Sequence, residues 1–244
     1  MSNDNDIVTP FRPLTALRAV GRLMQNPEDT SQVFVIMTAL RGRSGMRMLR
    51  RFRASAAGTA VIAERRRLLD YLSDRAALAA LADGSLGRAY LAFMDDEQLS
   101  ADGLVEASRS ARRGTAGSDA ALFLDRMRDM HDLTHVVTGY GRDTLGELCL
   151  LAFMYRHTGN PGGALIALMG MSRFPAGAAG RAARAALFEG FRHGGRARWL
   201  PGQDWEALLA RPLVEVRREL NIPVPERYLA TPVITGADTA ASLA

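Results

Sequence analysis

Residues 119–157 read DAALFLDRMRDMHDLTHVVTGYGRDTLGELCLLAFMYRH, and this stretch decides the fold. Its apolar residues recur at helical spacing, which predicts one helix over Asp119–Thr138. The glycines of Gly139-Tyr140-Gly141 end that helix, and Asp143 or Thr144 begins a second helix over the rest of the stretch. The stretch therefore predicts two consecutive helices joined by a short glycine-rich turn.

The rest of the chain follows the same pattern. No stretch shows sustained strand alternation or an internal repeat, and no linker divides the chain. We expect an all-α, single-domain helical bundle over residues 1–228 and a loosely ordered tail over residues 229–244. The polar stretch Asp95–Gly117 allows no firm assignment. Further helices are expected on both sides of this stretch. One starts at Asn26-Pro27 and ends at Gly42–Gly45, the next covers Val61–Leu72, and another starts near Ser85. The last three cover Ala164–Met171, Gly180–Arg192 and Trp205–Leu220.

The composition limits the compartment. With 48% hydrophobic and 23% charged residues, the chain of 244 residues can bury a sizeable core. Cys149 is the single cysteine and has no disulfide partner, which suits a reducing compartment. No run approaches the roughly 20 apolar residues of a membrane span, and the acidic N-terminus resembles neither a secretory signal nor a transit peptide. We therefore expect a cytoplasmic protein.

Arginine is the only basic residue type in the sequence, apart from four histidines. The net charge is +5, and all 31 basic residues are arginines. This excess fits either codon bias or anionic partners such as phosphate and lipid head groups. The arginines are scattered among acidic residues and only 7% of residues are aromatic, so we predict no nucleic-acid partner.

A helix predicted near the N-terminus, Leu14–Met24, is basic and amphipathic. Leu14, Leu17, Gly21 and Met24 share one face, while Arg18 and Arg22 lie on another. The pattern fits a helix that lies on a membrane surface. The pattern alone favours an ordinary surface helix whose apolar face packs against the core.

Two of the four histidines lie in one pentapeptide. His131 and His135 are four residues apart, so both imidazoles point to the same side of a helix. Asp132 follows about 100° around the helix and is able to bind the same ion or to hold a ligand by a hydrogen bond. The stripe Phe123, Met127, His131 and His135 predicts that this side faces the interior. Burying these polar groups together is costly unless a cation compensates.

Glu147 completes the set only if the chain reverses. In a continuous helix it would lie roughly 18 Å from His135, at 1.5 Å per residue. A reversal at Gly139–Gly141 gives an antiparallel helix pair with a metal site between facing side chains. Alternatively, Asp132 and a backbone carbonyl satisfy the histidines, and Thr144 with Glu147 forms a capping box. The predicted metal-binding and catalytic residues are His131, Asp132, His135 and Glu147.

These residues resemble the signature of the coenzyme Q biosynthesis protein 4 family, H-D-x-x-H, eleven residues, then E. Gly139 and Gly146 also match. The zincin motif fits poorly, since zincins carry Glu after the first His. The resemblance covers most of the chain, through Asn26–Phe34, Gly84–Tyr90, Phe191–Ala197, Trp205 and Pro212–Pro223.

The resemblance implies an all-helical, often dimeric protein at the membrane where ubiquinone is made. It implies zinc or a similar divalent ion at the four residues. Family members are described as enzymes that replace the C1 carboxylate of a polyprenylated 4-hydroxybenzoate precursor by a hydroxyl. They are also described as scaffolds that bind prenyl lipid and gather the other ubiquinone biosynthesis enzymes. Without a mitochondrial leader, a bacterial member peripheral to the inner (cytoplasmic) membrane is expected.

The chemistry bears on the identity of the ion. A divalent ion beside an aryl carboxylate would stabilise charge as carbon dioxide leaves. Zinc has no redox chemistry, whereas two histidines and a carboxylate also suit Fe(II). The predicted cofactor is therefore a divalent metal ion, zinc by resemblance, with Fe(II), Co or Mn as alternatives.

Several other residues carry weaker predictions. Cys149 is expected to be buried and inert, and His157 and His193 to lie at the surface or at helix ends. Arg217 and Arg218 either hold an anionic group or a partner, or pair with Glu215 or Glu219. The apolar segments Leu148–Tyr155 and Ala164–Met171, with Met127, Met130, Met154, Met169 and Met171, either line a lipid groove or form core.

Overall fold

The computed structural model describes residues 7–26, 29, 31–98 and 117–231. Part of the Asn26-Pro27 start signal, most of Asp95–Gly117 and most of the predicted tail lie outside these residues. The described residues form helices and no strand, which confirms the all-α prediction. They are α1 Pro13–Gln25, α2 Ser31–Ala39, α3 Ser44–Arg53, α4 Ala56–Glu64, α5 Leu68–Ser73, α6 Arg75–Ala79, α7 Leu86–Asp96, α9 Asp119–Thr138, α10 Thr144–Thr158, α11 Pro161–Met171, α12 Ala178–Arg196, a 3-10 turn η3 Leu200–Gly202, α13 Trp205–Leu208, α14 Leu213–Glu219 and α15 Glu226–Leu229.

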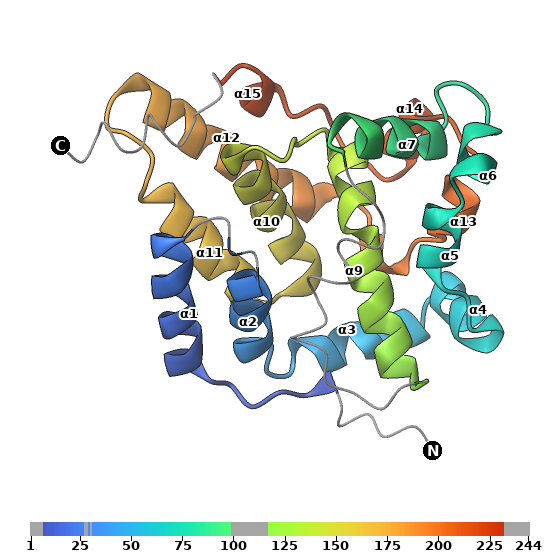
Figure 1. Ribbon diagram of the computed structural model, residues 1–244, viewed down its shortest axis with the longest axis horizontal. Helices are drawn as coiled ribbons and strands as arrows, with labels where there is room; N and C mark the ends of the chain where they lie inside the picture. Colours follow the sequence, from blue (N-terminus) through green and yellow to red (C-terminus); the bar gives the residue numbers. More distant parts are fainter. Residues whose placement is uncertain (1–6, 27–28, 30, 99–116, 232–244) are drawn as a thin grey trace.

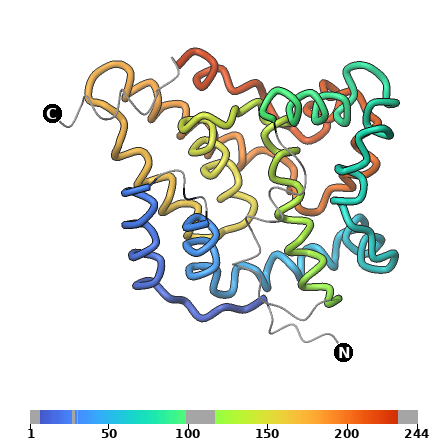
Figure 2. Tube along the Cα trace, in the orientation of Figure 1, coloured from blue at the N-terminus to red at the C-terminus, as the bar shows by residue number. Residues whose placement is uncertain are grey.

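Helices α9 and α10 occupy the middle of the molecule and run in opposite directions (Figure 1). Helix α10 packs mainly against α12 and α11, while α7, α5 and α14 pack against α9. Helices α1 and α2 lie together on one side, beyond α11, as the trace in Figure 2 also shows. The turn between α9 and α10 is therefore surrounded by helices from both halves of the chain.

The core is built on the apolar sides of these central helices. Met130 and Phe153 are fully buried in the larger cluster of apolar side chains. A smaller cluster joins α3 to α9 through the rings of Phe52 and Phe123, whose centroids lie 5.1 Å apart. Full burial of one such side chain contributes about 1.5–3 kcal/mol. A bidentate ion pair of Arg126 with Glu206, at 2.6 and 2.7 Å, further ties α9 to α13.

Two predicted helices are each divided in the structure. The predicted helix Val61–Leu72 is wrong, because α4 ends at Glu64 and Arg65 takes a left-handed conformation before α5 begins. The predicted helix Trp205–Leu220 is also wrong, because Pro212 has no N–H to continue a helix and instead precedes α14.

Two further differences concern the N-terminal third. Helix α3 was not predicted; it begins without a side-chain cap and is dense in arginine. Helix α2 begins at Ser31 rather than directly after Asn26, which instead ends α1. The Asp29 carboxylate accepts hydrogen bonds from the side chains of Ser31 and Gln32, and so holds the first turn of α2.

Helix α1 presents its large apolar side chains to the surface. Its buried face is made of Ala16, Ala19 and Val20, whereas Leu14 is 69% and Leu17 is 63% exposed. Leu14 and Leu17 therefore do not pack against the core, although Met24 at the other end of the predicted face does.

Among the described helices, none combines the length and the apolar character needed to cross a bilayer.

Candidate metal centre

The end of α9 is fixed by backbone capping and by an arginine. Gly139 takes the left-handed conformation, with φ 77°, and donates its N–H to the His135 carbonyl at 2.8 Å. Arg217 donates to the carbonyls of Val136 and Val137 at 2.9 and 3.0 Å. The Arg217 guanidinium thus caps α9 at the favourable end of the helix dipole, and the described residues form no ion pair with it. Binding of an anionic group by Arg217 stays a prediction.

The start of α10 is fixed by Asp143. Its carboxylate accepts hydrogen bonds from the backbone N–H groups of Leu145 and Gly146. The capping box on Thr144 is therefore wrong, and the Glu147 side chain is free to face α9. Gly146 is required by close packing, because a Cβ there would lie 2.1 Å from the carbonyl oxygen of Gly141.

Helix α15 holds the turn from outside. The Tyr228 hydroxyl donates to Asp143 and accepts from the Gly141 N–H at 3.0 Å. One phenol near the C-terminal end of the described chain therefore connects the two halves of the turn that brings α9 and α10 together. The sequence carried no signal for this contact.

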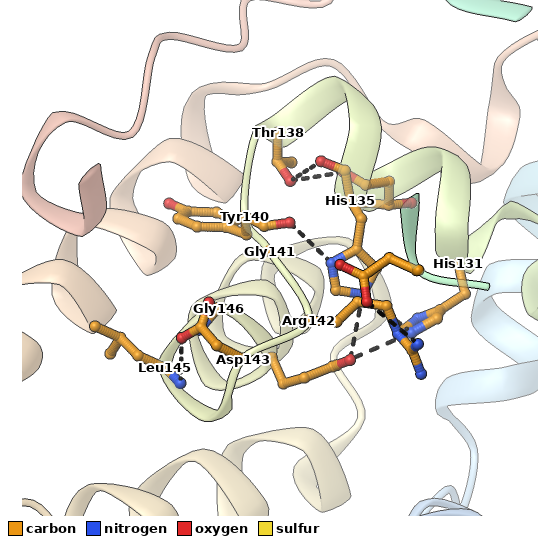
Figure 3. Close-up of polar contacts among 12 residues, drawn as sticks. His131, His135, Thr138, Tyr140, Gly141, Arg142, Asp143, Leu145 and Gly146 are labelled. Carbon is orange, nitrogen blue, oxygen red and sulfur yellow. Dashed lines mark hydrogen bonds and ion pairs between the residues drawn. The ribbon is translucent and has the colours of Figure 1, made fainter. Parts of the chain in front are cut away.

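This turn brings His131, His135 and Glu147 together. Their potential ligand atoms all lie within 4.8 Å of one another. The two Nε2 atoms are 3.3 Å apart, and Glu147 oxygens lie 3.5 Å from His135 Nε2 and 4.0 Å from His131 Nε2. Figure 3 shows both imidazoles directed to the same point. Ligands of a tetrahedral zinc ion at about 2.0–2.1 Å would be separated by roughly 3.3 Å, so the spacing fits a cation.

The tautomer of His135 also fits a ligand. Its Nδ1 lies 2.9 Å from the Tyr140 carbonyl, to which it donates its proton (Figure 3). In the neutral ring, Nε2 then carries a lone pair directed at the cluster. Two facing imidazole nitrogens beside a carboxylate require a proton or a cation between them.

The three groups shift one another's pKa. Burial alone would lower the pKa of His135, but the hydrogen bond and charge of Glu147 outweigh it and raise the pKa. Burial would raise the pKa of Glu147, yet the two histidines lower it. The pKa of His131 is lowered, first by burial and then by the neighbouring His135. The cluster is thus an electrostatically coupled unit.

One side of the cluster is accessible. The His135 side chain is fully buried, whereas those of His131 and Glu147 are 37% and 35% exposed. The prediction that both histidines face the interior is thus confirmed for His135, whereas His131 is only partly buried. The ring of Phe93 stacks on His135 at a centroid distance of 5.7 Å. Arg142 lies near enough for its charge to lower the pKa of Glu147, and pairs with Glu97 at 3.7 Å.

Asp132 lies beside the cluster rather than in it. It is buried on α9, and its charge favours the protonated form of both histidines. The same charge, after burial, raises the pKa of Tyr90 on α7. The structure thus groups three of the four predicted ligands and leaves Asp132 as a neighbouring anion.

The weaker predictions have mixed outcomes. Cys149 is fully buried as predicted, and burial raises the pKa of its thiol. His157 and His193 lie in the last turns of their helices, which confirms the helix-end alternative, and both are buried rather than at the surface. The methionines of the predicted lipid groove are buried in the larger core cluster or packed against it, as the core alternative expected: Met127, Met130, Met154, Met169 and Met171.

Fold and site together define an all-helical protein with two histidines and one carboxylate grouped at a helix–helix turn. The chain belongs to the family described as coenzyme Q (ubiquinone) biosynthesis protein Coq4, whose model matches residues 11–226. This membership assigns it a role in ubiquinone biosynthesis.

Relatives extend over most of the chain. The ubiquinone biosynthesis protein COQ4 homolog, mitochondrial, of Danio rerio is 29% identical over 213 residues, covering 86% of this chain and 77% of that protein. The Homo sapiens homolog is 27% identical over 217 residues, covering 88% and 80%. A crystal structure of a Nostoc punctiforme protein provisionally assigned to ubiquinone biosynthesis shares the fold, with a TM-score of 0.63 and 21% identity over 91% of this chain and 99% of that chain.

Proposed function

We propose that this protein catalyses the metal-dependent oxidative decarboxylation at C1 of a polyprenylated 4-hydroxybenzoate precursor of ubiquinone. The observation that carries the proposal is the cluster of His131, His135 and Glu147, which is buried on one side and accessible on the other. These three residues would hold a divalent ion, with Asp132 as a fourth ligand or as a charge that orients the histidines.

The residues around the cluster suit an aromatic acid. Phe93 provides an apolar ring beside His135, against which a benzene ring would pack. Arg142 supplies a positive charge on the accessible side, and its pairing with Glu97 at 3.7 Å is a loose one that a substrate carboxylate could replace. The bound ion would polarise the carboxylate and the ring as carbon dioxide leaves.

The reaction constrains the ion. Replacing a carboxylate by a hydroxyl removes two electrons from the aromatic substrate and adds one oxygen atom, so an external oxidant such as dioxygen is required. Because zinc has no redox chemistry, we propose that a redox-capable ion such as Fe(II) works at this site and that zinc substitutes for it. Turnover after reconstitution with Zn, Fe, Co and Mn tests this, and best activity with zinc would contradict it.

The decisive experiment starts from protein purified without air. Bound metal is identified by mass spectrometry, and a prenylated 4-hydroxybenzoate with a labelled carboxyl group is then supplied together with dioxygen. The His135→Ala variant is compared with His193→Ala, which removes another histidine from the last turn of a helix. Label loss that requires His135 and not His193 supports the decarboxylase.

The same experiment tests the alternative function. A folded, metal-bound protein that releases no label would overturn the decarboxylase and favour a non-catalytic scaffold. In that role the protein would bind prenyl lipid and organise the other ubiquinone biosynthesis enzymes, with the metal as a structural clamp. The association with those enzymes and the homodimer both stay predictions.

We also propose that the protein is peripheral to the inner (cytoplasmic) membrane, where a polyprenylated substrate resides; its bacterial origin stays a prediction. The support is α1, whose exposed Leu14 and Leu17 are accompanied by Arg18 and Arg22. Sedimentation with anionic vesicles should fall strongly in the Leu14→Ser/Leu17→Ser variant. Unchanged sedimentation would remove α1 from this role.

A further inference from the structure

A hollow lies at the end of α10 opposite to the metal cluster. It has a volume of about 210 Å³ and opens to the surface. Helix α3, the last turn of α10 and the segment before η3 form its walls. Its lining residues are Arg47, Met48, Arg51, His157, Thr158, Gly159 and Trp199.

The charge of the hollow is positive and uncompensated. Arg47 and Arg51 are four residues apart, so they lie on the same side of α3. Both are exposed, and within the described ranges no carboxylate forms an ion pair with either. Arg156 on α10 does not line the hollow and packs over the Phe191 ring, but its positive charge also acts on His157. Like charges held together are unfavourable by themselves, and an anion between them would relieve the repulsion.

The side chains are held in place. The Arg51 guanidinium lies 4.3 Å from the centroid of the Trp199 ring. The Trp199 indole in turn donates to the His157 carbonyl at 2.9 Å. Gly159 takes the left-handed conformation, with φ +57°, and a Cβ there would lie 3.8 Å from an Arg47 nitrogen. The hollow therefore has an aromatic wall, Trp199, over which the Arg51 guanidinium lies.

His157 adds a buried donor beside the hollow. Its Nδ1 accepts from the Leu200 N–H at 3.3 Å, so the neutral ring carries its proton on Nε2. Within the described residues Nε2 has no hydrogen-bond partner, although His157 is only 6% exposed. Burial, followed by the positive charges of Arg51 and Arg156, lowers the pKa of His157 to about 4. The neighbouring charges on His157 are thus positive.

From this arrangement we propose that the hollow binds a phosphate group. Arginine presents a planar fork of donors that matches phosphate oxygens, and two such forks face the hollow. The phosphate belongs either to a soluble phosphoester or to a lipid head group, since both present the same oxygens. The proposal is independent of the proposed decarboxylation, because none of its residues belongs to the metal cluster.

The test uses the fluorescence of the full-length protein. Trp199 lines the hollow, whereas the other tryptophan, Trp205, is fully buried and serves as a constant background. Sodium phosphate and sodium pyrophosphate are titrated against sodium chloride at equal ionic strength. A second arm compares sedimentation with vesicles that carry phosphatidic acid and with vesicles that carry the same charge as oleate.

The variant Arg47→Gln/Arg51→Gln is compared with Arg181→Gln, an exposed arginine near the start of α12. We expect a saturable phosphate response, or a preference for phosphatidic acid over oleate, that weakens at least fivefold in the double variant alone. The first result assigns a soluble phosphate, and the second a lipid phosphate. Absence of both effects, an equal effect of chloride, or equal loss in Arg181→Gln would overturn the proposal.

Discussion

A buried histidine lies at each end of α10: His135, which α9 brings to its N-terminal end, and His157 in its own last turn. The pKa values of these two histidines are shifted in opposite directions. At the N-terminal end, Glu147 raises the pKa of His135. At the C-terminal end, burial and then the positive charge of Arg51 lower the pKa of His157, to about 4. Both rings are buried against helices, so the difference comes from the charged neighbours.

The comparison separates a cation site from an anion site. A carboxylate with two imidazoles forms an acceptor-rich cluster that is suited to a metal ion. Two arginines with a neutral imidazole N–H form a donor-rich hollow that is suited to an oxyanion. In this chain the fold decides which histidine meets a carboxylate and which meets arginines.

The largest effect is expected at the carboxylate itself. The Glu147→Gln variant keeps the shape of the side chain but removes its charge, and we expect the affinity for zinc to fall more than about 100-fold. Competition with a chromophoric chelator measures this. The matched control is Glu189→Gln, a buried glutamate on α12 that is outside the cluster. Equal affinities of Glu147→Gln and wild type would place the metal elsewhere.

The second largest effect is expected at Asp132, the buried carboxylate beside the cluster. Because Asp132 lies outside the group of three and acts on the histidines through its charge, we expect Asp132→Asn to weaken metal binding about 10–100-fold. The visible spectrum of the cobalt-loaded variant should then match that of the wild type. A changed spectrum, with a loss as large as in Glu147→Gln, would make Asp132 a direct ligand.

The third prediction concerns pH and the other end of α10. An unfolded histidine titrates near its ordinary pKa of about 6.5, whereas buried His157 titrates at about 4. The unfolded state therefore binds the proton first, and stability is lost as the pH falls from about 6.5 towards 4. Lowering the pH from 7 to 5 should therefore reduce the free energy of unfolding by about 2 kcal/mol through His157.

Urea unfolding of metal-free protein at pH 7 and pH 5 measures that loss. The His157→Gln variant keeps an acceptor for the Leu200 N–H but does not titrate. Its unfolding free energy should therefore fall less than that of the wild type over this range, by about 2 kcal/mol. Equal pH dependence of the two proteins would contradict the burial argument.

The smallest effect is expected at the contact that holds the turn. Tyr228→Phe removes a hydroxyl that bonds Asp143 and the Gly141 N–H, which should cost about 1–2 kcal/mol of stability. Metal affinity should fall only a few-fold, because Asp143 still caps α10. Calorimetry with and without zinc measures both changes. A loss of affinity as large as in Glu147→Gln would show that α15 is part of the site.

Local sequence signals predicted the centre of the fold well. The limits of α9 agree with the prediction, because Ser118 caps it and Gly139 ends it within a few residues of the site. The reversal that brings Glu147 to His135 also followed from those glycines. Periodicity failed at Arg65 and at Pro212, where a left-handed residue and a missing donor interrupt an otherwise helical pattern.

Long-range contacts had no local signal. The contact between Tyr228 and Asp143 joins residues 85 positions apart, and the pairing of Arg217 with the end of α9 spans about as many. The spacing of His131 and His135 predicted that the two side chains share one face of the helix. It did not predict where that face meets solvent, so the partial exposure of His131 is known only from the structure. Such differences arise because tertiary packing, rather than helical periodicity, decides where a face meets solvent.

The unequal exposure of the three grouped residues has a consequence for metal supply. His135 is sealed inside the protein, while His131 and Glu147 reach solvent. An ion held there could be handed over by ligand exchange at the outer two residues, with no need to unfold the chain. The ion bound after purification would then depend on the metals present during purification, and zinc found in the isolated protein would not by itself identify the ion bound in the cell.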